Sequence, residues 1–125
     1  MLARTYRFHG HGSLRYVYTR GKAVRGSFGV LKYTPNTKRK KWRAAVVVSK
    51  KVHKSAVVRN RIRRRLYELL RTSIHPAAEP VDIVYVVYAP TVADMPASEL
   101  QKTIWCQLQK AEIKLNPHAI VDKKE

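Results

Sequence analysis

The chain has 125 residues, 45% of them hydrophobic, and a formal net charge of +18 at pH 7. This length fits one domain with a modest core, and the charge favours a polyanionic partner, because self-repulsion at this level is costly unless a partner neutralises it. A transmembrane helix and a signal peptide are not expected, because no sufficiently long apolar run is present. The single cysteine, Cys106, excludes an intrachain disulfide and suits the cytoplasm.

The charge is concentrated in the first part of the chain. Residues 1–67 contain 20 Lys and Arg and no acid, whereas residues 68–125 contain six basic and eight acidic residues, so contributions of +20 and −2 give the total of +18. We therefore expect the first part to carry the surface that contacts the polyanion.

The early elements follow from caps and apolar spacing. We expect a basic arm over residues 1–10, one domain over residues 11–115 and a tail over residues 116–125. Ser13 can cap a short helix that ends at Arg20. Strands are predicted over residues 28–33 and 44–49, with a short extra strand possible over residues 22–25.

The later elements complete an α-β-β-α-β-α order. Ser55 is the predicted N-cap of a long helix that ends near Ser73, before a proline. A strand over residues 81–89 and a final helix from about residue 96 or 98 to residue 116 follow. The predicted class is α+β, with a small sheet packed with helices.

The long helix carries the densest charge of the chain. Val58, Ile62 and Leu66 share one face, together with Leu69. Asn60, Arg63, Arg64, Tyr67 and Arg71 fall broadly opposite, with Arg61 and Arg65 on one flank and Arg59 on the other. Five arginines within residues 59–65 repel one another at helical spacing, which favours an anionic ligand. The planar guanidinium suits phosphate, with which it forms paired hydrogen bonds.

The segment 49–64 resembles the signature of the bacterial ribonuclease P protein family, in which paired lysines at a strand end precede a basic run that opens a helix. Lys50 and Lys51 match the paired lysines, and Arg59 begins the run. Arg63 stands where lysine is common in the family and keeps the charge. The likeness extends loosely over residues 8–115. It implies an RNA-binding subunit of the ribonucleoprotein that removes the 5′ leader from precursor tRNA.

The resemblance also implies a fold like domain 2 of ribosomal protein S5, with a mixed sheet and a left-handed βαβ crossover. The strand that ends near Lys50 and the strand over residues 82–89 would be parallel and joined by the long helix. Right-handed connections predominate by a wide margin in general, so the expected hand comes from the resemblance alone.

Two RNA sites are implied by the resemblance. The RNA subunit would bind the helix through Arg59, Asn60, Arg61, Arg63, Arg64 and Arg65. A cleft for the single-stranded 5′ leader would be formed by Leu14, Tyr16, Tyr18, Tyr33, Lys50, Lys51 and His53, since aromatic faces hold unpaired bases without regard to sequence. Leu14 stands where phenylalanine is usual, and Leu31 is the alternative to Tyr33 on the same strand face.

Catalytic residues and a metal site are not expected in the chain. Metal-dependent phosphodiester hydrolysis needs carboxylates that hold the ions, and the basic part has none. The resemblance implies that the RNA subunit supplies catalysis and binds most of the Mg²⁺. The expected partners are the catalytic RNA and precursor tRNA with its leader, without DNA or membrane. A ribosomal RNA-binding protein of related fold and a self-sufficient nuclease are the alternatives.

Overall fold

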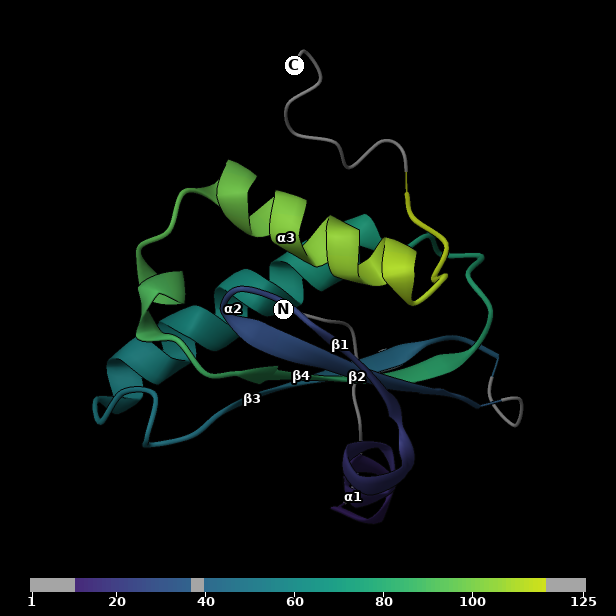
Figure 1. The fold of residues 1–125 in the computed structure, drawn as a ribbon, viewed down its shortest axis with the longest axis horizontal. Coiled ribbons are helices and arrows are strands. Elements are labelled where there is room, and N and C mark those ends of the chain that lie inside the picture. The colour runs from purple at the N-terminus through teal and green to yellow at the C-terminus, as the bar shows by residue number, and fades with distance from the viewer. Residues whose placement is uncertain (1–10, 37–39, 117–125) are drawn as a thin grey trace.

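The computed structural model describes residues 11–36 and 40–116, with side chains described from Arg15 onward (Figure 1). Its elements in chain order are α1 (His11–Arg20), β1 (Lys22–Arg25), β2 (Gly29–Pro35), β3 (Arg43–Val48), α2 (Ala56–Ser73), β4 (Val81–Val87), the 3-10 helix η2 (Pro90–Ala93) and α3 (Ala97–Lys110). This order confirms the predicted α+β class and the extra early strand. The arm over residues 1–10 and the tail beyond residue 116 lie outside the described residues.

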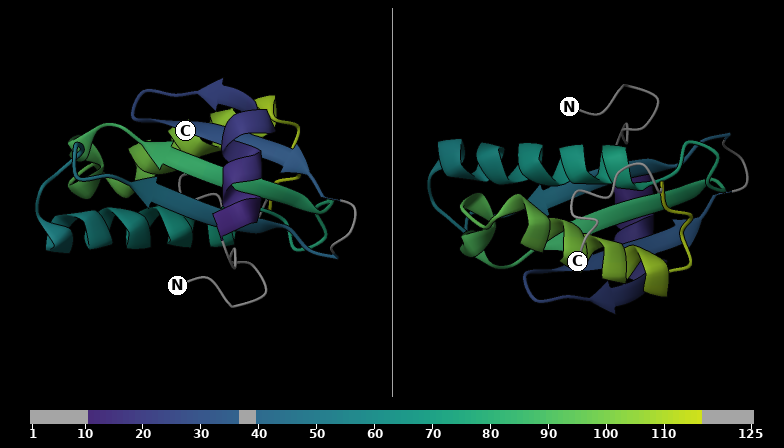
Figure 2. Two further views of the ribbon diagram at one scale, coloured as in Figure 1. Left: turned by 90° about the horizontal axis from the view of Figure 1, so that it is seen from below. Right: turned by 90° about the horizontal axis from the view of Figure 1, so that it is seen from above.

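The four strands form one mixed sheet in the order β1-β2-β4-β3. β1, β2 and β4 pair antiparallel, whereas β3 pairs parallel with β4. Seen from the side of α1, β3 and β4 both point toward the left, β4 lies above β3, and α2 lies behind the sheet (Figure 2, left). The β3-α2-β4 crossover is therefore left-handed, against the general preference.

Helices cover both faces of the sheet. α2 and α3 lie on one face and α1 lies on the other (Figure 1). Ile62, Leu66 and Leu70 of α2 are fully buried against the sheet, and Leu100, Ile104 and Leu108 of α3 complete the same core. The predicted apolar face of α2 is thus confirmed, with Val58 and Leu69 only partly buried at its margins.

The ends of α2 follow the expected local chemistry. The side chain of Ser55 accepts a hydrogen bond from the backbone N–H of Val58, which satisfies one of the unpaired donors at the helix start. The helix ends at Ser73, with Ile74 in an extended conformation, two residues before Pro76. Here the sequence signals and the structure agree to within a residue.

The final helix ends earlier than predicted. α3 stops at Lys110, and Glu112 has a φ of 61°, which reverses the chain. The following segment returns toward the end of α2, where Leu115 pairs with Ile74 and the backbone N–H of His75 donates to the carbonyl of Lys114. The periodic spacing of Leu115 thus reflects packing of an extended segment, rather than a longer helix.

A buried ion pair joins the starts of β3 and β4. Nε and Nη2 of Arg43 donate to the two carboxylate oxygens of Asp82 at 2.8 and 2.9 Å, and Nδ2 of Asn36 donates to the same carboxylate. The paired hydrogen bonds raise the pKa of Arg43, so its charge is retained in spite of burial. Because Arg43 and Asp82 are register partners, the pair fixes the parallel alignment of the two strands.

We expect Asp82→Ala to lower the free energy of unfolding by about 3–5 kcal/mol, because Arg43 would remain buried without its carboxylate. Urea unfolding measures the loss. The matched control is Glu79→Ala at an exposed position, where a change below about 0.5 kcal/mol is expected. Equal losses in the two variants would contradict a structural role for the ion pair.

Candidate nucleic-acid interface

The arginines of α2 differ in what they contact, although they are close in sequence. Asn60, Arg61 and Arg64 are exposed, whereas Arg59, Arg63 and Arg65 are half-buried. The basic run therefore does not form one uniform surface, because its guanidinium groups differ in exposure and in their hydrogen-bond partners.

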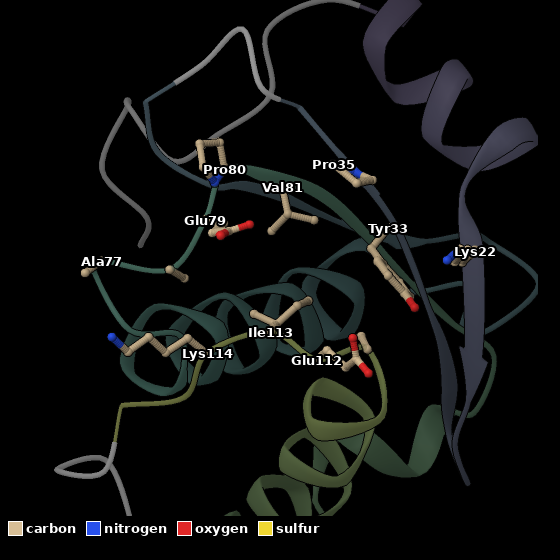
Figure 3. Close-up of a pocket in the computed structure, with 12 residues that line it drawn as sticks. Lys22, Tyr33, Pro35, Ala77, Glu79, Pro80, Val81, Glu112, Ile113 and Lys114 are labelled. Carbon is tan, nitrogen blue, oxygen red and sulfur yellow. The ribbon is translucent and has the colours of Figure 1, made fainter.

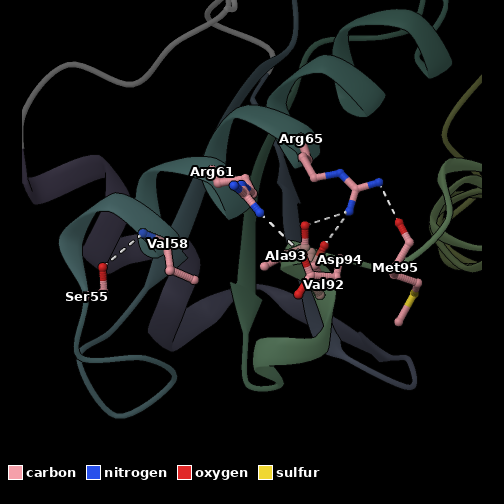
Figure 4. A network of polar contacts seen from close by, with 8 residues as sticks. All are labelled: Ser55, Val58, Arg61, Arg65, Val92, Ala93, Asp94 and Met95. Carbon is pink, nitrogen blue, oxygen red and sulfur yellow. Dashed lines mark hydrogen bonds and ion pairs between the residues drawn. The ribbon is translucent and has the colours of Figure 1, made fainter.

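Arg65 is held within the protein. Its Nη1 donates to the carbonyls of Val92 and Ala93 at 2.7 and 3.1 Å, and its Nη2 donates to the carbonyl of Met95 at 2.5 Å (Figure 4). These carbonyls belong to η2 and the turn that follows it. The side chain thus fixes the connection between β4 and α3 against α2, a role that the sequence did not predict.

Arg59 organises the turn before α2. Its Nη1 donates to the carbonyls of His53 and Lys54, while Nδ1 of His53 accepts the backbone N–H of Ser55. The turn over residues 49–55 is thereby folded back on the helix start. Lys50 and Lys51 are exposed on this turn, next to the C-terminal ends of β3 and β4.

The remaining basic side chains form the accessible part of the surface. Nη1 of Arg61 lies 3.3 Å from the Asp94 carboxylate in an exposed pair, which contributes little to stability (Figure 4). Arg63 donates to the side chain of Asn60, and Arg64 has no hydrogen-bond partner among the described residues. We call Asn60, Arg61, Arg63 and Arg64 the arginine surface.

Further along α2, beyond the arginine surface, Glu68 and Arg71 form an ion pair. Arg71 donates to the carboxylate of Glu68 one turn earlier, and this hydrogen bond lowers the pKa of Glu68. Tyr67, expected on the exposed side, instead turns toward the sheet, where its hydroxyl accepts the backbone N–H of Val46 in β3. β3 is an edge strand, so this contact satisfies a donor on its outer side.

The opposite face of the sheet carries α1 with exposed tyrosines. Val17 is fully buried under the helix, whereas Tyr16 and Tyr18 are exposed by 56% and 43%. Nζ of Lys32 lies 4.2 Å from the ring centroid of Tyr18 and also donates to the Tyr18 carbonyl. Leu14 belongs to α1, but its side chain lies outside the described part, so its predicted role stays a prediction.

Beside α1 the sheet presents a row of half-buried aliphatic residues. Val30 of β2, Val86 of β4 and Val47 of β3 are register neighbours and therefore point to the same face. The row lies toward the C-terminal ends of β3 and β4, where Tyr88 and the Lys50-Lys51 turn also lie. These aliphatic residues were not predicted; the alternation along β2 and β4 is the signal that would have identified them.

Tyr33 lies on the other face of the sheet. It alternates with Lys32, which contacts α1, and shares its face with the buried Leu31. Its ring points into a hollow of about 580 Å³ whose lining includes Val81, Ile113 and Glu112 (Figure 3). The structure therefore does not bring Tyr33, or its alternative Leu31, together with Tyr16 and Tyr18.

Within residues 11–36 and 40–116, no group of three His, Cys, Asp or Glu side chains is placed to hold a metal ion. No helix in this part of the chain is long and apolar enough to cross a membrane.

The fold and the basic helix define an α+β protein with a cationic surface that suits a polyanion, and comparisons identify its family. Residues 2–112 match the family model described as Ribonuclease P. A ribonuclease P protein component of a Synechococcus species is 31% identical over 115 residues, covering 80% of this chain and 88% of the relative. That of Chloroflexus aurantiacus is 32% identical over 110 residues, covering 88% and 80%.

Solved structures give the same result. The RNase P protein of Staphylococcus aureus superposes with a TM-score of 0.73 at 25% identity, covering 86% of this chain and 96% of that one. That of Thermotoga maritima gives a TM-score of 0.71 at 18% identity, covering 83% and 96%, and supports the fold. The chain therefore belongs to the ribonuclease P protein family.

Arg65→Ala is expected to lower the free energy of unfolding by about 1–3 kcal/mol, because carbonyls beside buried Val92 and Ala93 would lose their donors. Arg64→Ala, at the next position, is the matched control and should change stability by less than about 0.5 kcal/mol. Chemical denaturation of both variants makes the comparison. A loss no greater for Arg65→Ala than for Arg64→Ala would refute its structural role.

Proposed function

We propose that the chain binds the catalytic RNA of ribonuclease P through the arginine surface and assists in removing the 5′ leader of precursor tRNA. The observation that carries this proposal is the arrangement on α2, where one side is buried in the core while Arg63 and Arg64 point outward without a carboxylate partner among the described residues. Guanidinium groups so placed can form paired hydrogen bonds with phosphates.

The leader is proposed to lie on the sheet beside α1. Tyr18 offers an aromatic face to an unpaired base, Lys32 places a cation next to it, and the row at Val30, Val86 and Val47 offers an apolar floor. Stacking and apolar contact tolerate any base, which suits a leader of variable sequence. We assign Lys50 and Lys51, which lie where the aliphatic row ends, to contacts with phosphates.

Catalytic groups are assigned to the RNA subunit and its Mg²⁺. Three of the carboxylates in the described part accept from arginines: Asp82 from Arg43, Glu68 from Arg71 and Asp94 from Arg61. Oxygen lone pairs that accept these hydrogen bonds are less available to Mg²⁺, which binds through carboxylate oxygens. In the proposed holoenzyme the protein contributes binding and charge neutralisation.

Reconstitution tests the assignment. Protein alone is expected to leave precursor tRNA intact. Together with ribonuclease P RNA at low Mg²⁺, it should raise the cleavage rate above that of RNA alone, because cations of the protein reduce repulsion between the two RNAs. The gain should shrink at high salt or high Mg²⁺. Cleavage by protein free of RNA, or no gain at any Mg²⁺ concentration, would overturn the proposal.

The two faces of the sheet allow a matched test of the leader site. Tyr18→Ala should weaken binding of precursor tRNA to the holoenzyme by about one to two decades, since each stacked base contributes roughly 1–3 kcal/mol. Binding of mature tRNA should stay nearly unchanged. Tyr33→Ala is the control on the opposite face and should affect neither RNA selectively. An equal effect of Tyr18→Ala on both RNAs would show that the ring does not contact the leader.

A further inference from the structure

A second basic site lies between the β1–β2 turn and α3. Arg25, Ser27, Lys102, Thr103 and Lys110 line a hollow of about 320 Å³ there, together with Gly26, Cys106 and Gln107. No carboxylate belongs to this lining. The site shares no residue with the arginine surface.

Buried hydrogen bonds hold the two walls of the hollow together. Nε2 of Gln107 donates to the carbonyls of Val24 and Gly29, and its Oε1 accepts the hydroxyl of Tyr85. Gly26 lies so close that an added Cβ would be 2.7 Å from the Gln107 side chain. The buried side chain of Gln107 therefore holds α3 and the β1–β2 turn in a fixed relation, which gives the two walls of this exposed hollow a defined spacing.

The charges at the hollow are uncompensated. Arg25, Lys102 and Lys110 are exposed, and none of them forms an ion pair or side-chain hydrogen bond with another described residue. The nearest acid along α3 is Glu99, which precedes Lys102 by three positions and is absent from the lining. Three cations with the hydroxyls of Ser27 and Thr103 make a set of donors and no carboxylate acceptor, which suits a phosphate.

The hollow and the arginine surface lie at opposite edges of the sheet. β1 and β3 are the two edge strands. α3 lies beside β1 and α2 beside β3 (Figure 2, right). One phosphate group cannot contact both surfaces, so a phosphate bound at the hollow would belong to a different segment from a phosphate bound on α2.

We infer that this hollow binds the phosphodiester backbone of a further RNA segment, distinct from the RNA proposed for the arginine surface and from the leader proposed beside α1. RNA is favoured over other polyanions because the chain belongs to a ribonucleoprotein family. The inference depends on the proposed function in one respect, the choice of ribonuclease P RNA and precursor tRNA as probes.

Cys106 provides a direct test because it lines the hollow, is exposed and is the sole cysteine of the chain. A photoreactive group attached to it, in holoenzyme with each RNA labelled in turn, should crosslink to defined nucleotides and show which RNA supplies the segment. The control is Cys106→Ser with Glu79→Cys carrying the same probe, which should not give these crosslinks. Absence of RNA crosslinks from Cys106 would overturn the inference.

Charge removal gives a second, independent measurement. Lys110→Gln should reduce the slope of log K against log salt for the crosslinked RNA by about one unit, and Lys102→Gln with Lys110→Gln by about two. Lys114→Gln, which removes the same charge outside the hollow, is the matched control and should leave the slope unchanged. Arg63→Ala reports on the arginine surface. A lower slope for Arg63→Ala with no effect of Lys110→Gln would refute the second site and leave the proposed function intact.

Discussion

Strand β4 lies between β2 and β3 and buries side chains on both faces of the sheet. Ile83 and Tyr85 pack under α2 and α3, while Val84 points to the face covered by α1. Alternate residues of β4 pack against the helices on opposite faces of the sheet. The register of β4 with β2 and β3 therefore cannot shift by one residue without exposing the core. That register aligns Val30, Val86 and Val47 in one row and turns Tyr33 away from it.

The fold tolerates the closely spaced arginines of α2 because these arginines make different contacts. Arg59 and Arg65 donate to backbone carbonyls, which disperses their charge within the protein and fixes the segments on both sides of the helix. Arg61 is near Asp94, and Arg63 and Arg64 remain for a ligand. The repulsion inferred from the sequence is thus partly relieved by the fold, and fewer arginines than the run suggests are left to bind phosphate.

Most of the fold was predicted from local signals. Ser55 marks the start of α2, its apolar spacing marks the buried face and the following proline marks its end, and each of these signals depends only on residues nearby in sequence. The class and the β3-α2-β4 order followed from such signals, whereas the left hand of the crossover was expected from family resemblance alone. The end of α3, the partners of Arg65 and the face of Tyr33 depend on contacts between distant segments. Apolar periodicity alone does not distinguish a helix from an extended segment that packs on the same core, which explains the error at Leu115.

The two RNA contacts proposed for α1 and α2 are brought together by the parallel pairing of β3 and β4. Parallel neighbours end at the same edge, so the turn with Lys50 and Lys51 leaves β3 where the aliphatic row of the sheet also ends. α2 begins directly after this turn, and its N-terminal end adds a partial positive charge there. A single strand lying along the row therefore meets cations at that end of the sheet, next to the start of the arginine surface. Leader and catalytic RNA are thus expected to meet where the crossover begins.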